Sequence, residues 1–284
     1  MAKKLTLQAY LKENPNALEK LSLENMQRID KEVKKDSIYG YESKIIKNFI
    51  KDNPKNTVET IIAIKIMMID YTNSTNLSMQ KNEGIIQAIT KEILEHKDFD
   101  KMLENGDTEA VNIISKQKAI STDKKIKIFS FATKYCTYHS ANLYEDSYSI
   151  YDSIVSILLP HYAKKVDLKI TTYDLQKYRE ACDYAAFNEV IKQVLRKNNI
   201  MDKKIRIQFD HFLWWQGKKC QDAIKNSQTM QISKPDTLQN LTDKPKDKAI
   251  SAIFKGCKLY ATHPHTFKGN QAMHQKAEIR RIYI

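Results

Sequence analysis

A lysine and an aspartate, two residue types that can act together in nucleophilic chemistry, lie close together in the segment FATKYCTYHSANLYEDSYSIYDS, residues 131–153. Lys134 lies in an aromatic-rich stretch, and Asp152 directly precedes the apolar run SIVSILLPHY. A partly desolvated amine loses its proton more easily and becomes a nucleophile. An aspartate at a helix start is oriented by backbone N–H groups and can stabilise a nearby positive charge. Asp152 is therefore a candidate to stabilise a positive charge close to this lysine-containing segment.

The elements that must hold this pair are predicted to be α-helices. The 284 residues include only 6 Gly and 6 Pro, and an all-β fold would need more turn-forming residues. Apolar residues recur at helical spacing, with Ser, Thr or Asp at the expected helix starts. We predict short helices within residues 1–35 and further helices at 57–76, 83–97, 108–119, 123–139, 153–162, 171–199 and 202–219. The fold class is therefore all-α, with the strongly apolar helix at 57–76 in its centre.

The helix predicted at 123–139 has two different faces. Its core face consists of Ile128, Phe129, Ala132, Tyr135, Cys136 and His139. The opposite face carries Lys127, Phe131, Lys134 and Tyr138, a mixture typical of a solvated surface or of a cleft wall that contacts a nucleotide. The candidates to contact a base in such a cleft are Tyr135, Tyr138, His139, Tyr151, Ser153 and Trp214. For each aromatic candidate, packing in the core is the alternative role.

The charge of the chain favours a nucleic-acid partner. The formal net charge is +13, which gives a positive surface field. The 15 tyrosines are interleaved with lysines, and this combination suits stacking on bases together with pairing to phosphates. Lysines that only solvate helix faces are the alternative explanation.

No metal, organic cofactor or membrane segment is expected. The four cysteines, at positions 136, 182, 220 and 257, form no CxxC motif, so we interpret them as reduced thiols of a cytoplasmic protein. The spacing is too loose for a zinc site in the set Cys257, His263, His265 and His274. The N-terminus has no apolar signal core, and the apolar stretch at 61–69 is too short to span a membrane.

Composition divides the chain into three parts. Residues 1–219 contain the predicted helices and form the main domain. Residues 220–248 are polar, contain two prolines and are predicted to be a linker. Residues 249–284 are predicted to form a small, basic and less ordered C-terminal extension.

The order of these motifs resembles the helix-hairpin-helix DNA glycosylases. It is most similar to the branch of 8-oxoguanine DNA glycosylase and its bacterial relatives, over roughly residues 40–220. The motifs that carry the resemblance are IKIMMIDYTNSTN, SFATK, IYDS and FDHFLWWQGK. The segment at the hairpin position, AISTDKKIK, lacks the glycines usual in the family. Lys124, Lys125 and Lys127 are therefore expected to contact the DNA phosphates there.

The resemblance implies an enzyme with two helical lobes flanking a cleft. Such an enzyme flips a damaged or modified base out of double-stranded DNA and cleaves its N-glycosidic bond. Asp152 would stabilise the sugar cation, and Lys134, or alternatively Lys127, would attack C1′ and permit strand cleavage. If the lysine is structural, water replaces it and the product is an abasic site. The default substrate is an 8-oxoguanine-like base in DNA repair; a modified phage base, in phage defence, is the alternative. No obligate protein partner is implied.

Three other functions remain open from the sequence. Arg206-x4-His211 on a predicted helix resembles the motif of HEPN-type ribonuclease toxins. A DNA-binding protein without catalysis would share the basic charge and the helices. An oligomerising structural protein would use the LWW motif at 213–215 as an interface.

Overall fold

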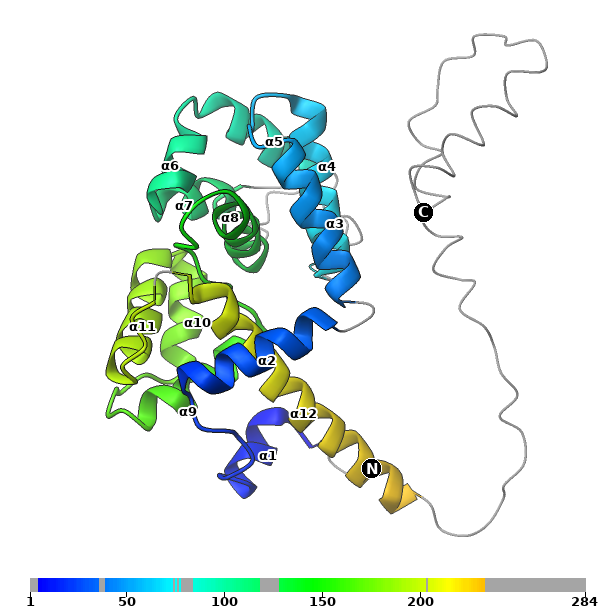
Figure 1. Cartoon of the computed structure of the whole chain (residues 1–284), viewed down its shortest axis with the longest axis vertical. Coiled ribbons are helices and arrows are strands. Elements are labelled where there is room, and N and C mark those ends of the chain that lie inside the picture. Colours follow the sequence, from blue (N-terminus) through cyan, green and yellow to red (C-terminus); the bar gives the residue numbers. More distant parts are fainter. Residues whose placement is uncertain are drawn as a thin grey trace, which may run out of the picture. The chain divides into compact units, whose positions relative to one another are not determined.

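The structure is a computed structural model of the chain, and it describes residues 5–35, 39–73, 75, 77, 84–117, 128–202 and 204–232. Every regular element in these residues is an α-helix (Figure 1), which confirms the all-α fold class. The helices are α1 (Leu7–Glu13), α2 (Leu23–Lys35), α3 (Tyr39–Asp52), α4 (Glu59–Thr72), α5 (Ile85–Glu95), α6 (Phe99–Asn105), α7 (Glu109–Ser115), α8 (Phe129–Leu143), α9 (Ser153–Lys164), α10 (Thr172–Ala181), α11 (Tyr184–Lys197) and α12 (Arg206–Ile232).

The described helices form two groups (Figure 1). In one group, α3, α4, α6 and α7 contact α8, and α5 packs against α4 and α7. In the other group, α1, α2 and α9 contact α12, and α10 and α11 cover α9. The groups meet where α2 contacts α3, α7 contacts α11, and α8 contacts α12. Side chains of α8 and α12 can therefore meet at this junction.

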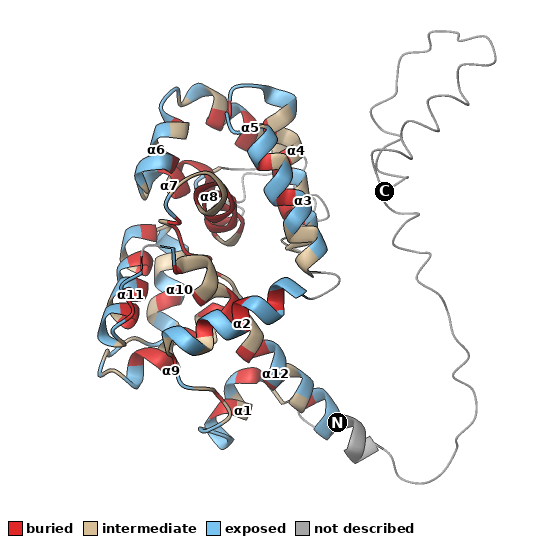
Figure 2. Ribbon diagram, viewed as in Figure 1, coloured by how far each residue is buried: buried red, intermediate tan, exposed pale blue. Residues whose placement is uncertain are grey.

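The helix enclosed on all sides is α8 and not α4. All residues of α8 from Phe131 to Ser140 are buried (Figure 2), so Phe131, Lys134 and Tyr138 lie inside the protein together with the predicted core face. The helix predicted to be central, α4, exposes Met67 and Tyr71, which are 46% and 62% accessible. Apolarity alone did not identify α8, because many of its buried side chains are polar and form hydrogen bonds. Thr133 Oγ1, for example, donates to Ser130 O at 2.9 Å.

The long segment predicted as one helix at 171–199 is two helices. α10 begins at the predicted threonine cap, where Thr171 and Asp174 form a capping box. It ends at Cys182, whose φ of 55° is left-handed, and Asp183 then caps α11 by accepting a hydrogen bond from Ala186 N at 3.0 Å. Neither Gly nor Pro marks this break, and its one local signal is the capping aspartate, Asp183.

α12 continues well beyond the predicted end near Gly217. It runs to Ile232, so residues 220–232 are helical and are not a linker. Gly217 lies in the middle of the helix, where a Cβ would come within 2.5 Å of Ile154 Cγ2. The glycine therefore permits close packing of α12 against α9 rather than ending the helix. The rest of the predicted linker, and the predicted extension at 249–284, lie outside the described residues.

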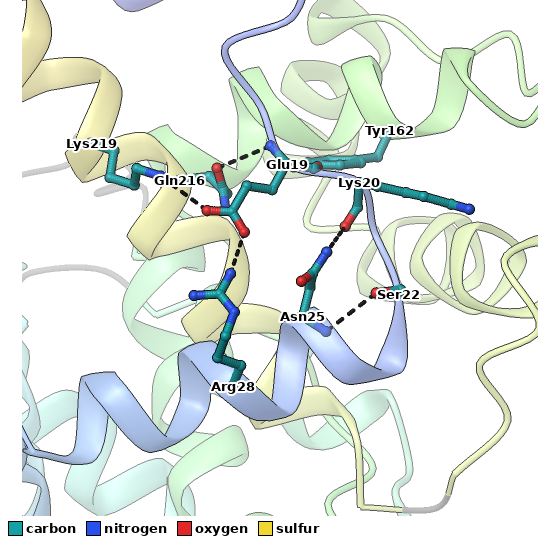
Figure 3. Close-up of polar contacts among 8 residues, drawn as sticks. All are labelled: Glu19, Lys20, Ser22, Asn25, Arg28, Tyr162, Gln216 and Lys219. Atoms are coloured by element: carbon teal, nitrogen blue, oxygen red, sulfur yellow. Dashed lines mark hydrogen bonds and ion pairs between the residues drawn. The ribbon is translucent and has the colours of Figure 1, made fainter.

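A polar cluster before α2 holds the second group together (Figure 3). The Glu19 carboxylate accepts a hydrogen bond from Lys219 Nζ at 3.0 Å and pairs with Arg28. Glu19 N donates to Gln216 Oε1 at 3.3 Å, and Tyr162 Oη donates to Glu19 O at 3.0 Å. These bonds join α2, α9 and α12. α12 carries a residue of the candidate site, and α9 begins directly after another.

Candidate active site

Lys134 extends from α8 toward the junction between the two groups of helices. Its side chain is buried, with 7% of the residue accessible, and its Nζ donates to Asn73 O at the end of α4, at 3.5 Å. Burial lowers the pKa of this amine, and the carboxylates of Asp152, Asp210 and Asp70 oppose that shift. Lys134 is therefore a buried amine that interacts electrostatically with carboxylates from three different segments.

Asp152 is the N-cap of α9, as the sequence predicted. Its Oδ1 accepts a hydrogen bond from Val155 N at 2.8 Å, which fixes the carboxylate at the positive end of the helix. The side chain is half-buried and interacts electrostatically with Lys134 and with Asp210. The lysine and the aspartate of the opening sequence motif therefore interact electrostatically, without a hydrogen bond or an ion pair between these two described residues.

Asp210 is a third member of the site, and our sequence analysis did not single it out. It lies on α12 and is half-buried. Burial raises the pKa of its carboxyl well above the usual range, and the charge of Asp152 adds to this, whereas Lys134 acts in the opposite direction. The available signal was an acidic residue inside the apolar segment FDHFLWW, where a charge needs a partner.

The loop between α8 and α9 fixes the position of Asp152. Tyr151 N donates to Thr133 Oγ1 at 3.0 Å, and Ser149 N donates to Tyr184 Oη at 2.7 Å. Asp146 Oδ2 accepts from Ile207 N at 3.0 Å, which connects the loop to the first turn of α12. The loop is therefore attached to α8, α11 and α12, the helices around the site.

Two of the predicted base-contacting residues, Tyr135 and His139, lie in the core. Neither is accessible to solvent. Tyr135 Oη donates to Asn56 Oδ1 at 2.8 Å, and His139 Nδ1 lies 2.8 Å from Tyr135 O. Burial lowers the pKa of His139 to about 3, so its ring is neutral. In this structure neither ring faces a surface where a base could stack.

Tyr151 and Tyr138 are also buried. The ring of Tyr151 makes edge-on contacts with Phe129 and Phe187, each with ring centroids 5.3 Å apart. Tyr138 lies beside the lysine site, because its Oη accepts a long hydrogen bond of 3.5 Å from Asn73 Nδ2. Core packing, the alternative role for each aromatic candidate, is thus the one that the structure supports for Tyr135, Tyr138, His139 and Tyr151.

Ser153 and Trp214 are the base-contacting candidates that reach the surface. Ser153 is exposed and follows Asp152 directly. Trp214 is half-buried on α12, one turn after Asp210, and Lys218 Nζ lies 5.7 Å from the centroid of its ring. These two residues remain candidates to line the entrance to the site.

The predicted phosphate contacts cannot be placed. Lys124, Lys125 and Lys127 lie outside the described residues. A groove of about 720 Å³ lies along the C-terminal half of α9, and its lining includes His161, Lys164 and Lys169. None of its lining residues belongs to the site around Lys134.

The residues of the ribonuclease-like motif are anchored separately. Arg206 Nη1 donates to Ser149 Oγ at 3.2 Å. His211 is buried, and its Nδ1 lies 2.7 Å from Asp30 Oδ1. A ribonuclease would need these two side chains to reach one substrate, and the burial of His211 does not favour that function.

The described residues contain no cluster of three or more His, Cys, Asp or Glu side chains arranged to hold a metal ion. The loosely spaced set at Cys257, His263, His265 and His274 lies outside these residues. None of the helices in the described part of the chain has both the length and the apolar character that a membrane crossing requires.

Comparisons with known proteins identify relatives without an assigned activity. A family model described as an N-terminal domain, HI_0787_N, matches residues 19–143, which include Lys134 and end before Asp152. An uncharacterized protein of Haemophilus influenzae (strain ATCC 51907 / DSM 11121 / KW20 / Rd) is 31% identical over 160 residues. The matched region is 56% of this chain and 70% of that protein. No solved structure matches the chain.

Proposed function

We propose that this chain, which belongs to the same family as the Haemophilus influenzae protein, is a DNA glycosylase that removes a damaged or modified base from double-stranded DNA. The observation that supports the proposal is the buried amine of Lys134 in electrostatic contact with Asp152, a carboxylate held at a helix N-terminus. The net charge of +13 supports a polyanionic substrate.

The reaction begins with a nucleotide that has left the DNA stack. Extruding a base costs a few kcal/mol, and the basic protein surface stabilises the distorted duplex. As the bond between C1′ and the base breaks, positive charge develops on the sugar. The Asp152 carboxylate stabilises this charge, because it is fixed by Val155 N and needs no reorganisation during the reaction.

Lys134 acts as the nucleophile in its neutral form. The Nζ lone pair forms a bond to C1′, and the electron pair of the breaking glycosidic bond leaves with the base. The nitrogen then loses a proton and the departing base gains one, so that protons balance. The C1′–O4′ bond then breaks, its electron pair stays on O4′, which takes a proton, and the nitrogen lone pair forms the C=N bond. The resulting protonated imine permits strand cleavage by β-elimination. We assign this role to Lys134, whose charge interacts with that of Asp152; the alternative, Lys127, lies outside the described residues.

A screen of duplex oligonucleotides that carry different lesions tests the proposal. It includes 8-oxoguanine, the default substrate, and modified phage bases, and it measures base release. The wild type should release at least one base, and Asp152→Asn should reduce the rate by about 10²-fold or more, because an oxyanion-hole-type electrostatic contribution of this kind is typically worth that much. Asp222→Asn, an exposed aspartate on α12, is the matched control.

Three outcomes would contradict the proposal. Full activity of Asp152→Asn would show that this carboxylate does not stabilise the sugar cation. DNA binding that weakens steeply with salt, without base release from any lesion, would indicate a non-catalytic DNA-binding protein. Cleavage of RNA that depends on His211 but not on Asp152 would indicate a ribonuclease instead.

A further inference from the structure

The groove along α9 is a second concave surface, separate from the candidate active site. It has a volume of about 720 Å³ and is lined by residues of α1, of the C-terminal half of α9, of the loop that follows and of the start of α10. Its apolar lining consists of Ile157, Pro160, Leu168 and Ile170. A concave surface of this size, largely apolar and with a few charged groups, is typical of a ligand-binding site.

The charged groups of this groove are mainly positive. They are Lys164, Lys169 and His161, together with one carboxylate, that of Asp167. Among the described residues, none of these four side chains takes part in a hydrogen bond or an ion pair. Burial lowers the pKa of His161, and the positive charges of Lys165 and Lys164 lower it further. The groove therefore has positive charge that the described part of the protein does not neutralise, and an anion is its complementary ligand.

An exposed aromatic ring belongs to the same lining. Tyr173 is 64% accessible, and Lys177 Nζ, one turn farther along α10, lies 4.5 Å from the centroid of its ring. A positively charged groove that follows a phosphate backbone, combined with an aromatic ring on which a base can stack, is the usual design of proteins that bind single-stranded nucleic acids. An intact duplex keeps its bases stacked inside and would leave the ring and the apolar lining unused. The lining therefore favours an unpaired strand.

The groove lies on the face of α9 that begins beside Asp152. Ser153, Ile157 and Lys164 are separated by four and seven residues, so they lie on one stripe of this helix. Ser153 is exposed and follows Asp152 directly, whereas Ile157 and Lys164 line the groove. The stripe is about 16 Å long, at about 1.5 Å per residue. A strand that passes the start of α9 can therefore continue into the groove.

We propose that this groove binds a segment of single-stranded DNA. Phosphates pair with Lys164 and Lys169, one base stacks on Tyr173, and the sugars lie against the apolar lining. Only the choice of DNA over RNA rests on the proposed function. Binding of the strand itself does not require that any base be removed.

The salt dependence of binding tests the role of the two lysines. Fluorescence anisotropy of a labelled oligothymidine of about ten nucleotides measures the affinity of the full-length protein at several salt concentrations. Lys164→Gln and Lys169→Gln should each weaken binding and reduce the slope of log affinity against log salt by about 0.7, the contribution of one phosphate of a single strand. Lys101→Gln, which removes an exposed lysine of α6, is the matched control and should leave the slope unchanged.

The aromatic contact has a test of its own. Tyr173→Ala should weaken binding of the oligothymidine by about fivefold or more, because stacking of one base on an aromatic ring contributes at least that much. Tyr173→Phe keeps the ring and should bind like the wild type. Tyr41→Ala removes a ring of α3 that is 58% accessible, and it should have no effect.

Four results would overturn the inference. The first is a salt slope that does not change when both lysines are replaced. The second is a duplex that binds as tightly as the oligothymidine and is weakened equally by these substitutions. The third is displacement of the oligothymidine by an equal concentration of thymidine triphosphate, which would indicate a small-molecule site. The fourth is tighter binding of oligouridine, which would indicate RNA.

The outcome is separable from that of the glycosylase proposal. Strand binding that depends on Lys164 and Lys169, without base release from any lesion, would support the groove and remove the proposed enzymatic function. Base release by a protein whose strand binding ignores both lysines would do the reverse. Lys164, Lys169 and Tyr173 are exposed, so their replacement leaves the core intact.

Discussion

Two buried lysines of this protein differ in the hydrogen bonds that hold their amines. Lys65 Nζ donates to Asn56 Oδ1 at 3.0 Å and to Lys55 O at 3.2 Å, and Tyr135 Oη donates to the same Asn56 oxygen. Lys134 Nζ has one long hydrogen bond, of 3.5 Å, to Asn73 O. Lys65 is therefore held by a network, whereas Lys134 keeps the freedom that a nucleophile needs.

The Lys65 amine should make stability depend on pH. Burial lowers its pKa to about 8, and Asp100 opposes this shift. Between pH 8 and about 10 the unfolded chain holds a proton at this position that the folded protein has lost, so stability rises with pH. The free energy of unfolding of the wild type minus that of Lys65→Met should therefore increase by about 1 kcal/mol per pH unit in this window.

Urea denaturation at several pH values measures this difference. Lys192→Met, which removes one exposed positive charge from α11, is the matched control. Free energies of unfolding of the wild type and Lys65→Met that differ by the same amount from pH 7 to pH 10 would contradict the prediction. That result would show that Lys65 is ionised to the same extent in the folded and the unfolded protein.

At the scale of elements, the packing of α12 on α9 depends on one glycine. A Cβ at position 217 would lie 2.5 Å from Ile154 Cγ2, closer than packed atoms approach. Gly217→Ala should therefore destabilise the protein by about 1–3 kcal/mol, although alanine gains up to about 1 kcal/mol in helix propensity. In a protein that already carries Ile154→Ala, the change Gly217→Ala should destabilise less, because the methyl group that the new Cβ would contact is absent.

Chemical denaturation of the single and double variants checks the prediction about Gly217. Ile154→Ala alone supplies the reference for the double variant, since removing a buried isoleucine destabilises by about 2–5 kcal/mol. Effects that simply add in the double variant would contradict a direct clash between positions 217 and 154.

The sequence predicted where individual helices begin better than it predicted which other helices contact them. Caps such as Asp152 and Thr171 marked helix starts, because their side chains bond to backbone groups a few residues away. The break at Cys182 was missed, since it needs a left-handed residue that is neither Gly nor Asn. The enclosure of α8 was missed as well, because it results from contacts with helices distant in sequence.

The same distinction applies to the site. Lys134 and Asp152 were singled out from residue type and from the helix start that follows Asp152. Asp210 comes from a helix that reaches α8 only through the fold, so no local pattern placed it there. Tyr135 and His139 were predicted both as core residues and as base contacts, and burial decided between these roles.

At the scale of the whole molecule, the site combines residues from both groups of helices. Lys134 and Asp70 come from α8 and α4, whereas Asp152 and Asp210 come from the start of α9 and from α12. Under the proposed function, the positive charge of the chain would attract DNA at long range, and the buried site would perform the chemistry. Binding and catalysis should therefore respond differently to a change at Lys134.

The most direct measurement is the identity of the residue that becomes covalently attached to DNA. The protein is incubated with a duplex that contains an abasic site or 8-oxoguanine, reduced with borohydride and analysed by peptide mass spectrometry. The adduct should lie on Lys134 in the wild type and be absent from Lys134→Gln. That variant should still bind the same duplex within about twofold, because the replaced side chain is buried and makes little contact with phosphates. An adduct on another residue, or one that persists in Lys134→Gln, would contradict the account.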